Sequence, residues 1–203
     1  MKQVMIFLIV LSTFAPTSGQ RRTGTAIQKS NARSPMRRVD FLNFTYPTSL
    51  CGEGVGLGKT VSVKNREFKQ GSGDDEAYFA VNETIYGDIT GDGDDEAIVH
   101  NVCGVASWNY GLDEFLIYTM RDGQVVLLGE LKGMVADYKH YFPNGTLWSP
   151  TDKGLKIRSG AVLIDWYADG PHCCPEYIAT LNYRWDGKQF VLSRRPLKRV
   201  FRQ

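Results

Sequence analysis

Five acidic residues lie within nine positions of the stretch GDITGDGDDEAIV, which covers residues 87–99: Asp88, Asp92, Asp94, Asp95 and Glu96. Hard cations such as calcium take about six to eight oxygen ligands, and a short loop can supply them when alternate side chains turn inward. A glycine at the sixth position of such a loop permits a sharp turn, and Gly93 holds that position when Asp88 is counted as the first. Without a cation the carboxylates would repel one another, so the spacing predicts a captured divalent ion.

The residues after the loop exclude an EF-hand. That motif requires a glutamate at position 12, and here the position is Val99. Residues 97–99 are all apolar, which is typical of a strand that leaves the loop. The stretch is therefore expected to consist of a strand, an acidic loop and a second strand.

The same stretch resembles the calcium loop of integrin-type FG-GAP and VCBS-like repeats, whose pattern is D-x-D/N-x-D-G-x-x-D/E followed by apolar residues. The resemblance implies that calcium is held by four side chains and one backbone carbonyl: those of Asp88, Thr90, Asp92 and Glu96, with the carbonyl of Asp94. Thr90 stands where the pattern has an acid or an amide and is a weaker ligand, so an affinity of about 10⁻⁴–10⁻³ M is expected, as in extracellular modules. The alternative is a solvated acidic turn that binds no metal.

A longer order of motifs resembles small exported bacterial proteins of unknown function, including the LppP/LprE lipoprotein family. The order runs from the acidic loop through Cys103, an Asp-Gly turn at residues 122–123 and a Cys-Cys-Pro motif at residues 173–175 to a final strand at residues 183–187. The resemblance spans residues 60–193 and implies no chemistry, because that family has no assigned activity. The chain lacks the lipid-bearing cysteine of such lipoproteins.

The two ends of the chain differ from its body. Residues 1–19 combine a positive start, an apolar run at residues 4–11 and small residues before a cleavage site, which indicates a signal peptide. The apolar run is shorter than the ~20 residues of a spanning helix, so we expect a secreted or periplasmic protein with no membrane span. Residues 20–38 are predicted to be a disordered basic arm and residues 194–203 a basic tail, which leaves residues 39–193 for one β-rich globular domain.

Charge excludes a nucleic-acid binder. The chain has 24 Lys and Arg and 22 Asp and Glu, and all of the acids lie in residues 39–193, while both ends are basic. The folded body is therefore negative, whereas a nucleic-acid-binding domain carries a basic surface. A protein or a glycan is the expected class of partner, and the sequence indicates no oligomeric state.

Four cysteines in an exported chain suggest two disulfides. They are Cys51, Cys103, Cys173 and Cys174. Because a bond between adjacent cysteines closes a strained eight-membered ring, we expect Cys173 and Cys174 each to pair with Cys51 or Cys103. The alternative is a metal or redox site at the adjacent pair, which His172 directly precedes.

Several stretches alternate or cluster apolar and aromatic residues over strand lengths. They are residues 41–46, 60–68, 78–86, 97–102, 114–119, 124–131, 161–167, 177–185 and 189–193. Asp-Gly pairs at residues 122–123 and 186–187 predict hairpins between neighbouring stretches, and residues 131–141 are the one candidate helix. The predicted fold class is mainly β, or α+β if the helix forms: a single domain of mostly antiparallel strands. Sandwich, barrel and propeller-like arrangements stay open.

The sequence does not match the hydrolytic, zinc or phosphate-binding motifs with which it was compared. None of the three histidines, His100, His140 and His172, belongs to a hydrolytic or zinc motif. The glycine-rich residues 52–60 miss the spacing of a phosphate-binding loop by one position. We therefore expect a non-enzymatic domain with no catalytic residues and no organic cofactor.

Aromatic residues offer a second class of function. Six of them could form a sugar-stacking face, although core packing is the commoner use of such side chains: Trp108, Tyr110, Trp148, Trp166, Tyr167 and Trp185. The leading hypothesis is an exported domain with a calcium-type loop and a role in binding or envelope structure. The alternatives are a carbohydrate- or protein-binding module that uses the aromatic face, and a secreted hydrolase or thiol-disulfide enzyme with His172 or His100 in a cleft beside acids.

Overall fold

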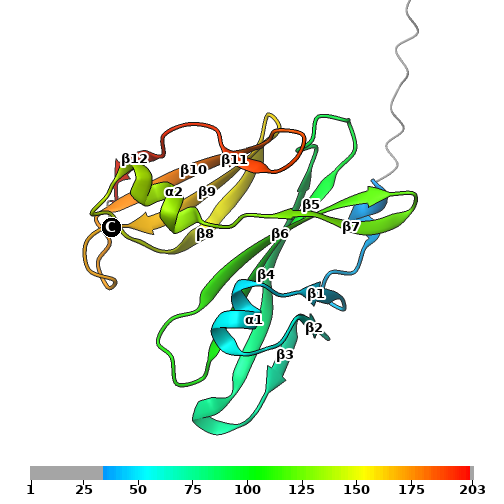
Figure 1. Cartoon of the computed structure of the whole chain (residues 1–203), viewed down its shortest axis with the longest axis horizontal. Helices are drawn as coiled ribbons and strands as arrows, with labels where there is room; N and C mark the ends of the chain where they lie inside the picture. The colour runs from blue at the N-terminus through cyan, green and yellow to red at the C-terminus, as the bar shows by residue number, and fades with distance from the viewer. Residues whose placement is uncertain (1–33, 202–203) are drawn as a thin grey trace, which may run out of the picture. The chain divides into compact units, whose positions relative to one another are not determined.

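The computed structural model describes residues 34–201 of the chain. The signal peptide expected at residues 1–19 and most of the basic arm expected at residues 20–38 lie outside the described residues. Two antiparallel sheets of five strands each form the body of the described part, and β1 (Thr45–Pro47) and β2 (Thr60–Ser62) pair as a small third sheet (Figure 1). The predicted fold class, a single domain of mostly antiparallel strands, is confirmed.

The elements follow one another along the chain in the order η1, β1, α1, β2, β3, η2, β4–β7, α2 and β8–β12. Their bounds are η1 Pro35–Arg38, β1 Thr45–Pro47, α1 Leu50–Val55, β2 Thr60–Ser62, β3 Glu67–Gln70, η2 Gly73–Asp75, β4 Ala77–Gly87, β5 Glu96–Val105, β6 Leu112–Arg121, β7 Gln124–Glu130, α2 Met134–Tyr141, β8 Leu147–Arg158, β9 Ala161–Ala168, β10 Tyr177–Trp185, β11 Phe190–Leu192 and β12 Leu197–Val200. The helix expected within residues 131–141 is α2.

The first sheet has the strand order β3-β4-β5-β6-β7, and its central strands are buried on both faces. Side chains alternate across a strand. On β5, Ile98 belongs to one apolar cluster, whereas its neighbours Ala97 and Val99 belong to a second. On β6, Ile117 and Tyr118 divide in the same way. The sheet therefore separates two cores.

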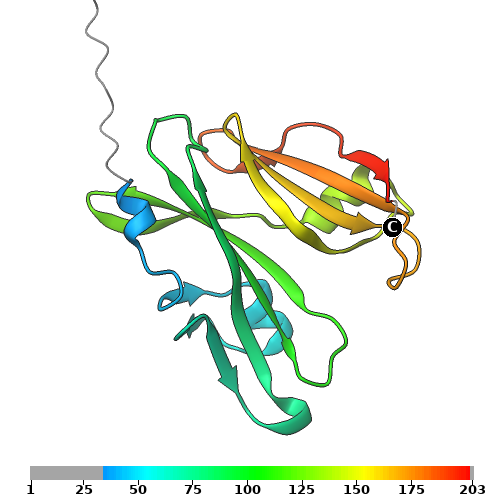
Figure 2. The ribbon, with the colours of Figure 1, turned by 180° about the vertical axis from the view of Figure 1, so that it is seen from behind.

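The second sheet has the order β11-β10-β9-β8, with β12 also paired to β10. One face contributes Ile164 of β9 and Leu181 of β10 to the first cluster, where Tyr138 of α2 joins them. Figure 2 shows these strands in front of α2, and Figure 1 shows α2 in front of the strands, so α2 covers one face of this sheet.

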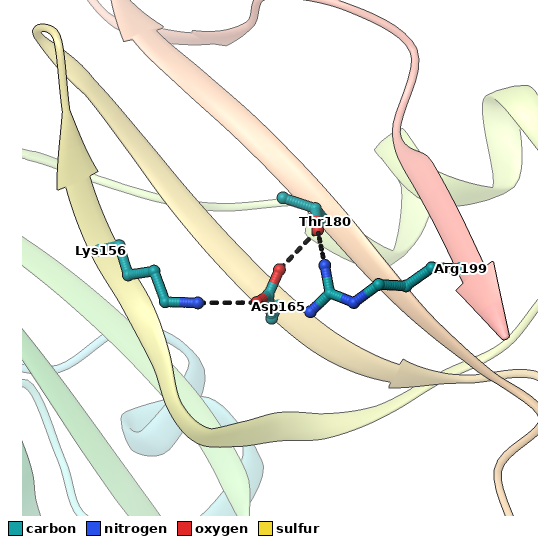
Figure 3. A network of polar contacts seen from close by, with 4 residues as sticks. All are labelled: Lys156, Asp165, Thr180 and Arg199. Atoms are coloured by element: carbon teal, nitrogen blue, oxygen red, sulfur yellow. Dashed lines mark hydrogen bonds and ion pairs between the residues drawn. The ribbon is translucent and has the colours of Figure 1, made fainter. Parts of the chain in front are cut away.

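The other face of the second sheet carries a polar network built around Asp165 (Figure 3). The carboxylate accepts hydrogen bonds from Thr180 at 2.5 Å, from Lys156 at 2.9 Å and from Arg199 at 2.9 Å. Burial alone would raise the pKa of Asp165, but these three donors outweigh it and lower the pKa. The network joins β8, β9, β10 and β12 across the sheet.

The second cluster covers the opposite face of the first sheet with the N-terminal segment. Met36 of η1 and Tyr46 of β1 are fully buried there, together with Cys51 of α1. The glycine-rich residues 52–60 contain most of α1.

The disulfide pairing predicted from the sequence is wrong. Cys51 is bonded to Cys103 of β5, with a Cα–Cα distance of 5.8 Å, so neither pairs with Cys173 or Cys174. The physical reason is that Cys51 and Cys103 share the second cluster, whereas the adjacent cysteines are exposed on the loop between β9 and β10. One disulfide instead of two is therefore formed between distant residues.

Both basic ends contribute elements to the fold within the described residues. Pro35–Arg38 forms η1 inside the range assigned to the arm, and Leu197–Val200 forms β12 inside the range assigned to the tail. Arg37 donates to Asp95 at 2.6 Å, and Arg199 belongs to the Asp165 network. Within residues 34–201, no helix has the length and apolar character needed to cross a membrane.

Removing the Cys51–Cys103 bond is expected to lower the free energy of unfolding by about 4 kcal/mol, because the bond closes a loop with a sequence separation of 52. The double variant Cys51→Ala/Cys103→Ala tests this by chemical denaturation. The matched control is Cys173→Ala/Cys174→Ala, for which a change within about 0.5 kcal/mol is expected of an exposed site. Equal denaturation midpoints for the two double variants would contradict the assignment.

Candidate functional site

The acidic loop joins β4 to β5 and is closed by its own hydrogen bonds. Asp88 accepts the backbone N–H of Gly91 at 2.7 Å and that of Gly93 at 3.0 Å. Asp92 accepts the N–H of Asp94 at 2.9 Å. Gly91 and Gly93 have φ of 86° and 93°, a region that favours glycine because it lacks a Cβ. The strand, loop and strand predicted from the sequence are confirmed.

Glu96 lies where this loop ends and β5 begins. Its carboxylate is fully buried and accepts the N–H groups of Ile89 at 2.9 Å and Thr90 at 3.1 Å. The Thr119 hydroxyl of β6 donates to the other oxygen at 3.1 Å. Burial raises the pKa of Glu96, these hydrogen bonds oppose the shift, and the charge of Asp92 adds to it.

The structure brings together some of the predicted calcium ligands. Glu96 turns into the loop, where the Thr90 hydroxyl lies 3.5 Å from its Oε1, and Asp92 is close enough to act on its pKa. Asp94 is exposed, and Asp95 is paired with Arg37. Within residues 34–201, no three His, Cys, Asp or Glu side chains are grouped as they would be around a metal ion. The carboxylates of Asp88, Asp92 and Glu96 are therefore bonded mainly to backbone N–H groups of the loop itself.

A separate cleft of about 440 Å³ lies beside the first sheet. Its walls come from six elements: α1, β6, β7, α2, β8 and β9. Its polar and aromatic lining consists of Ser49, Glu53, Asp113, Glu130, Lys132, Trp148 and Trp166. The volume falls in the range of about 300–1,000 Å³ that is usual for small-molecule sites.

Two indoles make the aromatic part of the cleft. Trp166 of β9 is 5% exposed, and its Nε1 is buried without a hydrogen-bond partner among residues 34–201. Trp148 of β8 is half-buried, and its Nε1 donates to the carbonyl of Asp169 at 3.3 Å. A buried N–H group without an acceptor costs free energy, which an acceptor on a ligand would recover.

Carboxylates make the polar part. Glu130 at the end of β7 accepts a hydrogen bond from Ser49 and lies 3.1 Å from the ammonium of Lys132. Asp113 of β6 is bonded to Nε2 of His100 at 2.7 Å. Glu53 of α1 is exposed at the rim. The cleft thus holds three carboxylates and one lysine that is already paired.

His100 positions Asp113 from behind the cleft. Its ring is 3% exposed and stacks on Phe115 with centroids 4.4 Å apart. The amide nitrogen of Asn82 lies 3.1 Å from Nδ1, so Nδ1 accepts and Nε2 carries the proton that is donated to Asp113. The imidazole does not line the cleft.

Glu114 follows Asp113 but points to the opposite face of β6. Its Oε1 accepts the N–H of Ser49 at 2.9 Å, just before α1 begins, and its Oε2 is buried without a partner among residues 34–201. Burial raises the pKa of Glu114, the Ser49 N–H opposes the shift, and the charge of Glu130 adds to it. Ser49 therefore links Glu114 to Glu130 at the edge of the cleft.

The six aromatics considered as a sugar-stacking face do not lie together. Trp148 and Trp166 share the cleft, whereas Trp108 stacks on Tyr110 at 5.1 Å. Tyr167 packs on Phe201 and borders a second pocket that Trp148 also lines, and Trp185 packs on Phe190. The cleft carboxylates were not singled out in the sequence, since each is one acid at a strand or helix end, and only their placement in three dimensions distinguishes them.

Comparison with known proteins gives no relative. No protein-family profile, no curated protein and no solved structure matches the chain. The function is therefore argued from the two sites themselves.

Replacing Glu114 by glutamine is expected to flatten the pH dependence of stability. An acid whose folded pKa is raised stabilises the fold below its unfolded pKa, and this contribution is lost as the pH rises through the folded value. Glu114→Gln keeps one oxygen for the Ser49 N–H and removes the buried charge. Urea denaturation between pH 4 and pH 8 should then show a smaller loss of stability with rising pH than in the wild type.

The control for this substitution is Glu53→Gln, because Glu53 is exposed. It should leave the pH profile unchanged. If Glu114→Gln and the wild type lost the same amount of stability over this range, the buried charge of Glu114 would have no role.

Proposed function

We propose that this chain is an exported, non-enzymatic domain that binds a neutral or cationic hydroxyl-rich ligand, a carbohydrate, in the cleft between Trp148 and Glu130. The observation that carries the proposal is the combination of two indoles and three carboxylates around one cavity of about 440 Å³. The acidic loop is proposed to have an architectural role in the same domain.

The chemistry of the cleft suits a sugar ring. The C–H face of a sugar is apolar and packs on an indole, while its hydroxyls donate to carboxylates. Asp113 and Glu130 offer acceptors of this kind, held in place by His100 and Ser49. Preorganised acceptors favour binding because little side-chain freedom is lost when the ligand arrives.

The charge of the cleft restricts its ligands. Glu53, Asp113 and Glu130 are opposed by Lys132 alone among the lining side chains, and Lys132 pairs with Glu130. Phosphate, sulfate or carboxylate groups would meet this negative field in a partly desolvated site. Neutral and amino sugars are therefore favoured over acidic ones.

The Cys51–Cys103 bond supports the proposal of export, since disulfides persist in oxidising compartments. The signal peptide predicted from the sequence points to the same compartment.

Calcium is proposed to bind the acidic loop. Asp88, Asp92, Asp94 and Glu96 form no ion pair within residues 34–201, and Glu96 carries its charge into a buried site. A bound calcium would supply the missing positive charge. The residues fit the ion only in part, because Asp88 and Glu96 are committed to backbone donors and binding would require some of these hydrogen bonds to be exchanged.

The cleft is tested with an array of neutral, amino and acidic glycans, followed by calorimetric titration of the glycans that bind. Trp148→Ala and Asp113→Asn are each expected to weaken binding about tenfold, which corresponds to about 1.4 kcal/mol. Trp185→Ala is the matched control, since Trp185 packs on Phe190 and does not line the cleft. Binding of acidic glycans alone, or equal affinities for Trp148→Ala and Trp185→Ala, would contradict the proposal.

The loop is tested by thermal unfolding with calcium. For a dissociation constant of about 1 mM, 10 mM calcium should stabilise the wild type by about 1.4 kcal/mol. That corresponds to a rise in Tm of about 3–6 °C. Asp92→Asn should remove this rise, because it removes one carboxylate whose charge acts on Glu96.

Asp75→Asn serves as the control for a lost surface charge outside the loop. Magnesium at equal ionic strength controls for screening. If the wild type responded equally to both ions, or if Asp92→Asn kept the full response, the loop would not be the calcium site.

A further inference from the structure

The loop between β9 and β10 holds the two cysteines that the long-range disulfide leaves over. It is compact: the N–H of Cys174 donates to the carbonyl of Pro171 at 2.9 Å, and that of Glu176 donates to Asp169 at 3.2 Å. Gly170 lies at φ 69°, and a Cβ there would come within 2.9 Å of the carbonyl of Cys174. The loop therefore fixes where the two cysteine side chains can lie.

The two sulfur atoms are in direct contact. Sγ of Cys173 lies 2.8 Å from Sγ of Cys174, and both residues are exposed. A disulfide bond is about 2.05 Å long, so bond formation needs a movement of less than about 1 Å. No other cysteine is free, because the chain has four and Cys51 is bonded to Cys103.

We propose that Cys173 and Cys174 form a reversible vicinal disulfide by exchange with an external disulfide, either glutathione disulfide or a protein dithiol in its oxidised form. One cysteine thiolate attacks a sulfur of the external disulfide, which forms a mixed disulfide and releases one thiol. The second cysteine thiolate then attacks the mixed disulfide and releases the other thiol. The two cysteines are oxidised, the external disulfide is reduced, and the two protons leave on the released thiols.

This bond is expected to be far easier to reduce than the buried one. Adjacent Cα atoms lie about 3.8 Å apart, which is less than the ~4.4–6.8 Å usual for bonded cysteines, so the ring is strained. Exposed and strained disulfides are the labile ones. Cys51 and Cys103 are fully buried and have an ordinary Cα–Cα distance of 5.8 Å.

The pair also borders an aromatic pocket of about 310 Å³ that Cys173 lines together with Trp148, Tyr167 and His172. His172 contacts Trp148 edge-on, with ring centroids 5.2 Å apart. Trp148 lines the binding cleft as well. Closing or opening the sulfur ring next to His172 therefore changes the surroundings of Trp148. An effect on ligand affinity rests on the proposed function, whereas the disulfide itself does not.

The experiment uses the full exported chain, unfolded without reductant and alkylated. Tryptic cleavage after Arg158 and Arg184 gives one peptide that contains both cysteines. The expected peptide is unalkylated and lighter than the dithiol form by two hydrogens. Alkylation of both thiols after incubation with glutathione disulfide, or glutathione on each of them separately, would overturn the proposal.

A titration of the folded protein with dithiothreitol tests reversibility. Two thiols are expected to appear while Cys51–Cys103 stays intact, with a change in tryptophan fluorescence that Cys173→Ser/Cys174→Ser does not show. Reduction of both bonds at the same dithiothreitol concentration would contradict the expectation that Cys173–Cys174 is the more easily reduced. Cys174→Ser and Cys173→Ser are each tested alone, and at least one of them is expected to take up one glutathione; the absence of glutathione on both would overturn the proposed exchange. If no glycan bound, the mass of the peptide would be unaffected. The proposal of glycan binding can therefore fail while that of the Cys173–Cys174 disulfide stands.

Discussion

Burial of β5 and β6 on both faces is the constraint from which the rest of the structure follows. A polar side chain on these strands is shielded from water, so each partner that it has inside the protein lowers the cost of its burial. Glu96 finds such partners in the backbone of the acidic loop and in Thr119. Glu114 finds one in the backbone at Ser49, and His100 finds one in Asp113. The polar groups of the central strands thus organise the loop, the start of α1 and the cleft.

The buried carboxylates of the two sheets differ in what they contribute to stability. Burial raises the pKa of Glu96 and of Glu114, so their charges cost stability near neutral pH. At Asp165 the effect of burial is outweighed by donors from three other strands, and its lowered pKa marks a charge that stabilises the second sheet until the pH falls through that value. The charges of Glu96 and Glu114, next to the two candidate sites, therefore cost stability, whereas the charge of Asp165 in the second sheet contributes to it.

Local features of the fold could be predicted from the sequence. The Asp-Gly pair at residues 122–123 has both φ angles positive and joins β6 to β7, as expected of a hairpin, and the one helix expected, within residues 131–141, is present as α2. The cysteine pairing and the cleft could not be predicted. Both depend on contacts between segments far apart in the chain: Cys51 and Cys103 are separated by 52 residues, and the cleft takes side chains from six elements.

The central claim is that buried carboxylates on β5 and β6 organise both sites, and a carbon-13 NMR titration of the glutamate carboxyls tests it most directly. The account predicts that the pKa values of both Glu96 and Glu114 lie above the ordinary value of a solvated glutamate. Ordinary titration of both Glu96 and Glu114 would show that water reaches them, and would contradict the account.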